Sequence, residues 1–149
     1  MAQTGGVRLD LPTLADTEAL AARIAAIARP GDAILLSGPL GAGKSAFARA
    51  FLRAACGNPA LEVPSPSYTL VQSYELPGFR AHHMDLWRLD GPESVLELGW
   101  DDMTDDVVLV EWPDRLGDLQ PADALHISFA HGEGGARLAT LSGWTERLA

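Results

Sequence analysis

The segment GPLGAGKS at residues 38–45 contains Lys44, the one lysine in a chain that has ten arginines. It matches the pattern G-x-x-x-x-G-K-[ST], in which glycines allow several backbone N–H groups to point at phosphate oxygens. In this pattern the lysine places a compact positive charge beside the β- and γ-phosphates, and the hydroxyl, here that of Ser45, binds Mg²⁺. The segment therefore predicts binding of a nucleotide together with Mg²⁺.

Contacts to the nucleotide are expected from the whole loop and from the start of the helix that should follow it, because a helix N-terminus adds partial positive charge. The expected base is adenine. Guanine-specific proteins of this kind usually read the base with N-K-x-D, which is impossible in a chain with a single lysine and a single asparagine, Asn58. The expected contact residues in the loop are Pro39, Leu40, Gly41, Ala42, Gly43, Lys44, Ser45 and Ala46.

Two acidic residues end apolar segments, where a protein with such a loop needs an acid near Mg²⁺. Glu111 ends VVLVE, and Asp85 follows RAHHM. Either can hold Mg²⁺ directly or through water, and either can orient the attacking water; Glu111 has the longer reach and is the better candidate base. We therefore expect Lys44, Glu111 and Asp85 to be catalytic, and Ser45, Glu111 and Asp85 to be the metal ligands.

The neighbours of these acids allow further interpretations. Trp112 can stack on the adenine or simply pack in the core. His82 and His83 suggest a metal cluster with Asp85, but successive side chains of a strand point to opposite faces. His83 and Asp85 would then share a face without His82, and two ligands are too few for a zinc site. We do not expect a transition-metal centre.

The surrounding pattern predicts an α/β domain with a mixed central sheet flanked by helices, and we expect residues 1–149 to form one domain. Apolar and alternating segments predict the strands, and 3.6-residue periodicity with capping residues predicts the helices. Thr13 or Asp16 can cap the first helix, which Pro30 and Gly31 should end. Strands are expected at 7–11, 32–38, within 63–75 and 80–89, at 107–112, and in a hairpin at 124–130 and 136–143; helices are expected at 13–31, 44–56 and 92–100.

Composition limits the classes of function. Twenty acidic residues against eleven basic ones give a formal net charge of −9, whereas a free-standing nucleic-acid binder usually carries a basic face. Cys56 is the only cysteine, so an internal disulfide is impossible. The chain has neither a run of about 18 apolar residues that could cross a membrane nor a secretory signal. We expect a cytoplasmic protein that acts through protein partners.

Five segments, in their order and spacing, resemble the TsaE (YjeE) family: GPLGAGKS, PSPSYTLVQSYE, HHMDLWRL, ELGWDD and LVEWPDRL. The resemblance covers about residues 10–145. The phosphate loop occurs in many proteins, but H-x-D-x-[YW]-R, E-W-P and S-P-[ST]-[YF]-T make the match specific. The resemblance implies a small bacterial P-loop ATPase needed for the threonylcarbamoyladenosine modification of tRNA next to the anticodon. It also implies two partners, TsaD, which carries the transferase chemistry, and TsaB, with ATP hydrolysis resetting their complex between rounds.

The resemblance also implies roles for individual positions. The segment around Leu11–Thr17, with Thr13, lies where family members approach the base, and Trp112 matches the aromatic residue near the base. Ser65 to Thr69 match a segment that resembles a switch loop near the γ-phosphate. Gly41, Gly43 and Lys44 match the phosphate loop, and Ser45 matches its metal-binding hydroxyl. Asp85 matches the acid of H-x-D-x-[YW]-R, and Glu111 matches the acid of E-W. Ser45 and Ser67 stand where threonine is frequent and keep the hydroxyl, whereas Trp87 lacks the hydroxyl of the usual tyrosine.

These observations together favour a Mg²⁺-dependent ATPase, weak alone and stimulated by partners, that binds ATP and ADP. Neither a direct tRNA-binding feature nor a membrane segment is visible in the sequence. Two alternatives stay open. A small-molecule kinase could use Arg80 and Arg88, although no long lid insertion is visible, and it would place phosphate on a metabolite. A non-hydrolysing ATP sensor would bind ATP without turnover, even with its partners.

Overall fold

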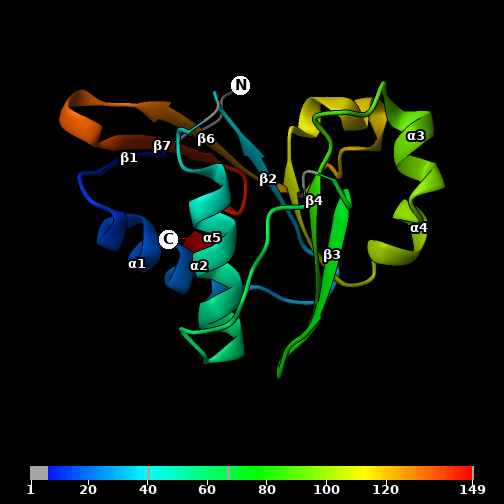
Figure 1. Ribbon diagram of the computed structural model, residues 1–149, viewed down its shortest axis with the longest axis horizontal. Helices are drawn as coiled ribbons and strands as arrows, with labels where there is room; N and C mark the ends of the chain where they lie inside the picture. The colour runs from blue at the N-terminus through cyan, green and yellow to red at the C-terminus, as the bar shows by residue number, and fades with distance from the viewer. Residues whose placement is uncertain (1–6, 40, 67, 149) are drawn as a thin grey trace.

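The computed structural model describes residues 7–39, 41–66 and 68–148, so the predicted contact Leu40 and the hydroxyl of Ser67 lie outside the described residues. Strands and helices alternate through the first half of the chain, and a hairpin follows near its end (Figure 1). The elements are β1 (Val7–Leu11), α1 (Leu14–Ile27), β2 (Ala33–Ser37), α2 (Lys44–Cys56), β3 (Val71–Glu75), β4 (Arg80–Asp85), α3 (Pro92–Glu97), α4 (Trp100–Met103), β5 (Val107–Glu111), the 3₁₀ segment η1 (Pro113–Leu119), β6 (Leu125–His131), the 3₁₀ turn η2 (Glu133–Gly135), β7 (Arg137–Ser142) and α5 (Thr145–Leu148).

The strands of the described residues form one seven-stranded sheet in the order β1-β7-β6-β2-β5-β4-β3. β2 pairs in parallel with β5 and β6, and β4 pairs in parallel with β5. β3 pairs antiparallel with β4 at one edge, and β1, β7 and β6 pair antiparallel at the other. The predicted mixed sheet is confirmed, and its parallel part lies at the centre, where both faces can be covered.

Helices cover both faces of the central strands. Figure 1 shows α1 and α2 on one side and α3 and α4 on the other. Side chains of β2 point alternately to the two faces of the sheet, and both faces are buried. Ile34 and Leu36 join the core beneath α1 and α2. Ala33 and Leu35 join the core that contains residues of α3, α4 and η1. A continuous apolar run is therefore what a strand buried on both faces requires.

The two helices nearest the nucleotide loop follow their sequence signals closely. Thr13 caps α1 in a capping box, because its hydroxyl accepts from the N–H of Asp16 and the Asp16 carboxylate accepts from the N–H of Thr13. α2 has the predicted bounds and ends at Gly57, whose φ of 71° suits glycine. α1 ends at Ile27, earlier than predicted, because the approach to Pro30 disfavours helical backbone.

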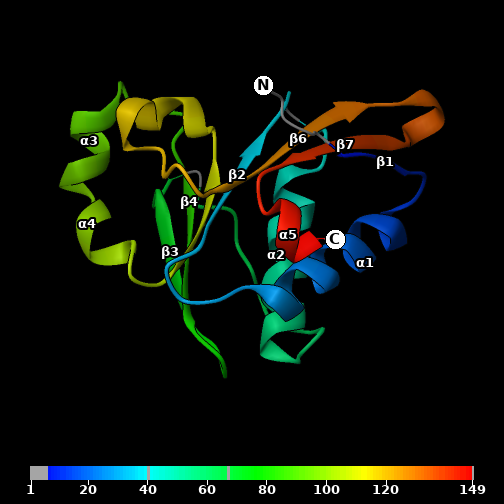
Figure 2. The same ribbon diagram turned by 180° about the vertical axis from the view of Figure 1, so that it is seen from behind.

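α5 has no counterpart in the sequence prediction and lies beside α1 and α2 (Figure 2). The Arg147 guanidinium donates to both carboxylate oxygens of Asp32, at 3.0 and 2.8 Å, and to the carbonyl of Ile27. It also lies 3.8 Å from the ring centroid of Trp144. Arg147 thus ties the end of the chain to the connection between α1 and β2. Within the described residues, no helix is both long and apolar enough to cross a membrane.

We expect Arg147→Ala to lower the free energy of unfolding by about 1–3 kcal/mol, because it leaves a largely buried carboxylate, Asp32, without its charged partner. Arg147→Lys should restore only part of this loss, since an ammonium cannot contact both oxygens as a planar guanidinium does. The measurement is urea unfolding followed by circular dichroism, with Arg8→Ala, on the exposed side of β1, as the control. Equal stability of wild type and Arg147→Ala would contradict the role of Arg147.

Candidate nucleotide site

The candidate site lies where the parallel strands β2, β5 and β4 end at the same edge of the sheet. The register places Leu36 beside Glu111 and Glu111 beside Asp85. β2 then leads through Ser37 into the glycine loop, which is followed by α2. Ligands of open α/β sheets bind outside the carboxyl ends of the strands. The fold thus brings the loop and both predicted acids to one place.

Glycine is required where the loop starts and ends. Gly38 has a φ of 133°, and a Cβ there would lie 2.4 Å from the carbonyl oxygen of Phe129 on β6, so the loop packs too tightly for any side chain. Gly43 has a φ of 120° and is the N-cap of α2 without a side-chain hydrogen bond. Because the first N–H groups of a helix have no partner within it, this end of α2 is suited to an anion.

Lys44 is folded over the loop and is only 4% exposed. Its ammonium Nζ donates to the carbonyls of Gly38, at 2.5 Å, and Pro39, at 3.1 Å, and lies 4.5 Å from the ring centroid of Trp112. Burial lowers the pKa of Lys44, whereas the negative charges of Glu111 and Asp85 oppose that shift. The ammonium is thus held at the loop by carbonyls and an aromatic face.

Glu111 is the centre of a buried hydrogen-bond chain. The Ser45 hydroxyl donates to Glu111 Oε1 at 3.0 Å, and His83 Nε2 lies 2.7 Å from Glu111 Oε2. Glu111 is 3% exposed. Ser45 lies in the first turn of α2, Glu111 ends β5 and His83 lies on β4, so the hydrogen bonds join three elements at the sheet edge. Ser45 and Glu111, both expected as metal ligands, are thus in direct contact, and their role toward Mg²⁺ stays a prediction.

Asp85 stands beside this chain and connects it to a second loop. Its carboxylate accepts the backbone N–H of Trp87 at 3.1 Å, and its own N–H donates to the Leu70 carbonyl at 3.0 Å. Leu70 has a φ of 70°, an uncommon value for a residue with a side chain. Ser65 lines the same cleft as Asp85 and Glu111, and Leu70 is hydrogen-bonded to Asp85. The switch role that the resemblance implies for this segment stays a prediction.

A cleft of about 330 Å³ collects most of the predicted residues. The predicted contacts Pro39 and Ala42 do not line it: the Pro39 carbonyl accepts from Lys44, and the Ala42 side chain is buried in the core while its N–H donates to Pro39. The residues that line the cleft are Leu11, Thr13, Leu14, Thr17, Gly41, Gly43, Lys44, Ser45, Ala46, Ser65, Asp85, Glu111, Trp112, Gly135 and Arg137.

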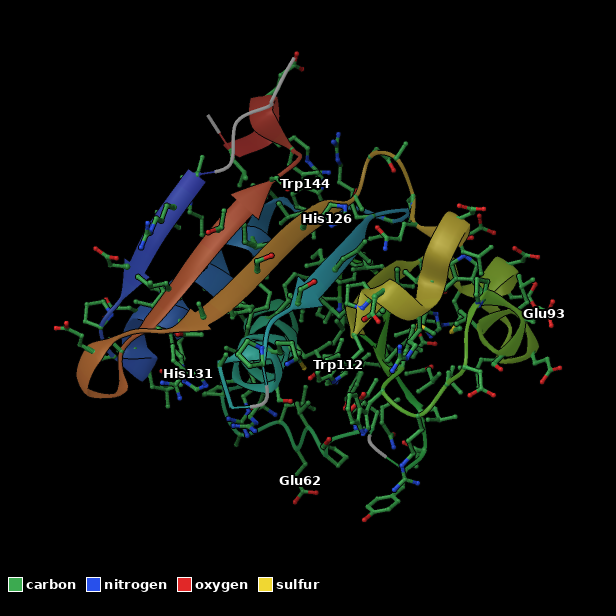
Figure 3. All side chains as sticks on the ribbon, turned by 90° about the horizontal axis from the view of Figure 1, so that it is seen from above. Glu62, Glu93, Trp112, His126, His131 and Trp144 are labelled. Carbon is green, nitrogen blue, oxygen red and sulfur yellow. The ribbon has the colours of Figure 1, made fainter. Side chains whose placement is uncertain are left out.

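Trp112 lies at the acidic end of the cleft. Its ring stands over the Lys44 ammonium and lies 4.6 Å, centroid to centroid, from the ring of Trp87. Its backbone is left-handed, with a φ of 61°, which turns the chain sharply after Glu111. Figure 3 shows Trp112 and His131 on either side of the loop that follows β2. The structure thus places Trp112 beside the residue expected to meet the phosphates.

The hairpin of β6 and β7 supplies two cleft residues that the sequence interpretation missed, Gly135 and Arg137. The Arg137 side chain passes close to Gly43, where a Cβ would lie 3.8 Å from Arg137 Cγ. Its guanidinium donates to the carbonyls of Gly135 and Ala136. An arginine at the start of a strand does not by itself indicate a place in a binding site. Only the antiparallel pairing of β6 and β7 brings Arg137 to the loop, so the sequence could not predict this position.

The residues of the cleft fit Mg²⁺ better than a transition metal. Ser45, Asp85 and Glu111 offer oxygen atoms, which hard cations prefer. Within the described residues, no group of three or more histidine, cysteine, aspartate and glutamate side chains is placed to hold a metal ion alone. Mg²⁺ commonly takes one or two carboxylates and completes its shell with water and phosphate oxygens. The donor set therefore suits a Mg²⁺ ion that arrives with a nucleotide.

Known proteins match the chain over most of its length. The family model for "Threonylcarbamoyl adenosine biosynthesis protein TsaE" matches residues 11–139. The tRNA threonylcarbamoyladenosine biosynthesis protein TsaE of Rickettsia conorii is 32% identical over 127 residues, covering 85% of this chain and 72% of that protein. The protein of the same name from Bacillus subtilis is 34% identical over 112 residues, covering 75% and 70%.

A solved structure gives the same picture of the fold. The crystal structure of YdiB from Bacillus subtilis superposes with a TM-score of 0.79 at 26% identity, covering 99% of this chain and 91% of that chain. The shared architecture is the single-domain α/β fold of P-loop nucleotide-binding proteins, as the sequence predicted. Together with the family match over the loop, both acids and β6, this shows that the chain belongs to the TsaE family of threonylcarbamoyladenosine biosynthesis proteins.

Proposed function

We propose that this protein binds and hydrolyses ATP with Mg²⁺ as the energy-using component of the threonylcarbamoyladenosine modification of tRNA. Membership of the TsaE family gives the pathway and a nucleotide-binding fold. The observation that carries the proposed reaction is the convergence of Lys44, Ser45, Asp85 and Glu111 at one end of a single cleft. A positive charge, a hydroxyl and two carboxylates are the groups that phosphoryl transfer to water requires.

Each of these groups has a distinct proposed role. The loop N–H groups and Lys44 hold the phosphates and stabilise the negative charge that develops on them. Bound Mg²⁺ would further neutralise the phosphate charge. Ser45 and one of the two acids hold the metal, and the Glu111 carboxylate orients the attacking water and accepts its proton. The adenine lies near Thr13 and Trp112, which both line the cleft and match the positions where family members approach the base.

We further propose that the protein works through partners of the TsaD and TsaB type. A place in the modification pathway implies partner proteins. The formal net charge of −9 opposes direct binding of tRNA by this chain, since phosphates repel an acidic surface. ATP hydrolysis would then reset a protein complex rather than act on tRNA, and turnover would depend on that complex.

The role of Lys44 predicts that Lys44→Ala weakens nucleotide binding by about 30- to 150-fold, equivalent to about 2–3 kcal/mol, because phosphates lose their charged partner in a buried site. Binding of a fluorescent ADP analogue measures the change. Arg8→Ala removes an exposed positive charge and serves as the matched control. Unchanged affinity in Lys44→Ala would contradict the assignment of the phosphate site.

The role of Glu111 predicts that Glu111→Ala keeps ATP binding but lowers turnover by about 100-fold or more, because a positioned general base contributes about 10²–10⁴. Release of free phosphate in the presence of TsaB and TsaD is the measurement. Glu93→Ala is the control, because Glu93 lies on α3, far from Trp112 in Figure 3. Full turnover of Glu111→Ala would show that the base lies elsewhere, and phosphate transferred to a metabolite would favour a kinase.

A further inference from the structure

We infer that His83 is the positioning residue of the site: it holds the Glu111 carboxylate in the orientation that the reaction requires. This inference builds on the proposed ATPase function. His83 lies on β4 and its side chain points to the same face of the sheet as Ala81 and Asp85, toward α2. It is 1% exposed, and its Nε2 lies 2.7 Å from Glu111 Oε2.

The two ring nitrogens of His83 have unequal surroundings. Nδ1 is buried, and within the described residues it has no hydrogen-bond partner. The only partner that the described residues offer the ring is therefore the Glu111 carboxylate at Nε2. An ionised carboxylate accepts hydrogen bonds and does not donate them, so the ring must carry its proton on Nε2 to make this contact.

Its neighbour His82 shows what a histidine with a structural role looks like in this fold. His82 Nδ1 lies 2.8 Å from Ser73 Oγ, and His82 Nε2 lies 2.8 Å from Asp106 Oδ2. Both nitrogens are used, and the ring joins β3 to the turn before β5. His83 uses only one ring nitrogen, because within the described residues its buried Nδ1 has no hydrogen-bond partner. Its polar contact serves Glu111 alone.

The geometry of the Glu111 carboxylate explains why such a contact matters. Ser45 holds Oε1, and His83 holds Oε2. The hydroxyl of Ser45 is also the proposed metal ligand, so its bond to Glu111 can be exchanged when a nucleotide binds. The bond from His83 goes to the other oxygen and comes from β4, which is paired with β3 on one side and β5 on the other. It can therefore keep one oxygen fixed while the other is presented to metal or water, as outer partners of reacting carboxylates do.

The test compares His83→Leu, which has similar volume but no donor, with His83→Gln, whose amide can still donate to Glu111. With TsaB and TsaD present, we expect His83→Leu to lower kcat about 10- to 100-fold. His83→Gln should restore most of the rate. The matched control is His82→Leu, which removes a buried histidine of the same strand and should lower the melting temperature while leaving kcat unchanged.

Two readouts stand apart from turnover. The gain in ADP affinity on adding Mg²⁺, relative to EDTA, should fall about 10-fold or more in His83→Leu and be kept in His83→Gln. In wild type, long-range ¹H–¹⁵N spectra of the histidine rings should show His83 protonated at Nε2, and Glu111→Ala should shift this signal whereas Asp85→Asn should not. These readouts test His83 even when no ATP is hydrolysed, so they separate failure of this inference from failure of the proposed function.

The inference is overturned by any of three results. His83→Leu with wild-type kcat and wild-type Mg²⁺ dependence would show that Glu111 needs no holding residue. Equal loss in His83→Leu and His83→Gln, with both variants folded, would show that the hydrogen bond is not what matters. Protonation of His83 at Nδ1 in wild type would remove the bond itself. Should His83→Leu not fold, His83→Gln and the wild-type spectra decide.

Discussion

The candidate site depends on one constraint, the register in which β2, β5 and β4 pair. This register places the end of β2, Glu111 and Asp85 side by side, so the loop that follows β2 meets two carboxylates. A slip of one residue in β5 would turn Glu111 to the opposite face of the sheet, away from Ser45 and His83. Register is strongly specified here because alternate residues of these strands fill two different cores.

The same packing explains how the protein keeps charged groups out of water. Lys44 and Glu111 are both almost fully buried, and removing such charges from water is costly unless each gains hydrogen bonds. The loop carbonyls satisfy Lys44, and Ser45 and His83 satisfy Glu111. These hydrogen bonds orient both charged groups, and electrostatic stabilisation is most effective from groups that need little rearrangement.

Much of this arrangement could be predicted from sequence, because its signals are local. The bounds of α2, the cap at Thr13 and the mixed sheet follow from periodicity, capping chemistry and alternation. Contacts between distant segments could not be predicted. Arg137 reaches the cleft only through the pairing of β6 and β7, and His83 meets Glu111 only through the register of β4 and β5. The position of Trp112 over Lys44 depends on a left-handed backbone that its side chain does not favour.

The most direct test of the whole interpretation is the rate of phosphate release from ATP and Mg²⁺ by the wild-type protein, with and without purified TsaB and TsaD. We expect slow release by the protein alone and clear stimulation by the pair, with both lost when Lys44 is replaced by alanine. ATP binding without phosphate release under any of these conditions would contradict an ATPase and would make the protein a nucleotide sensor.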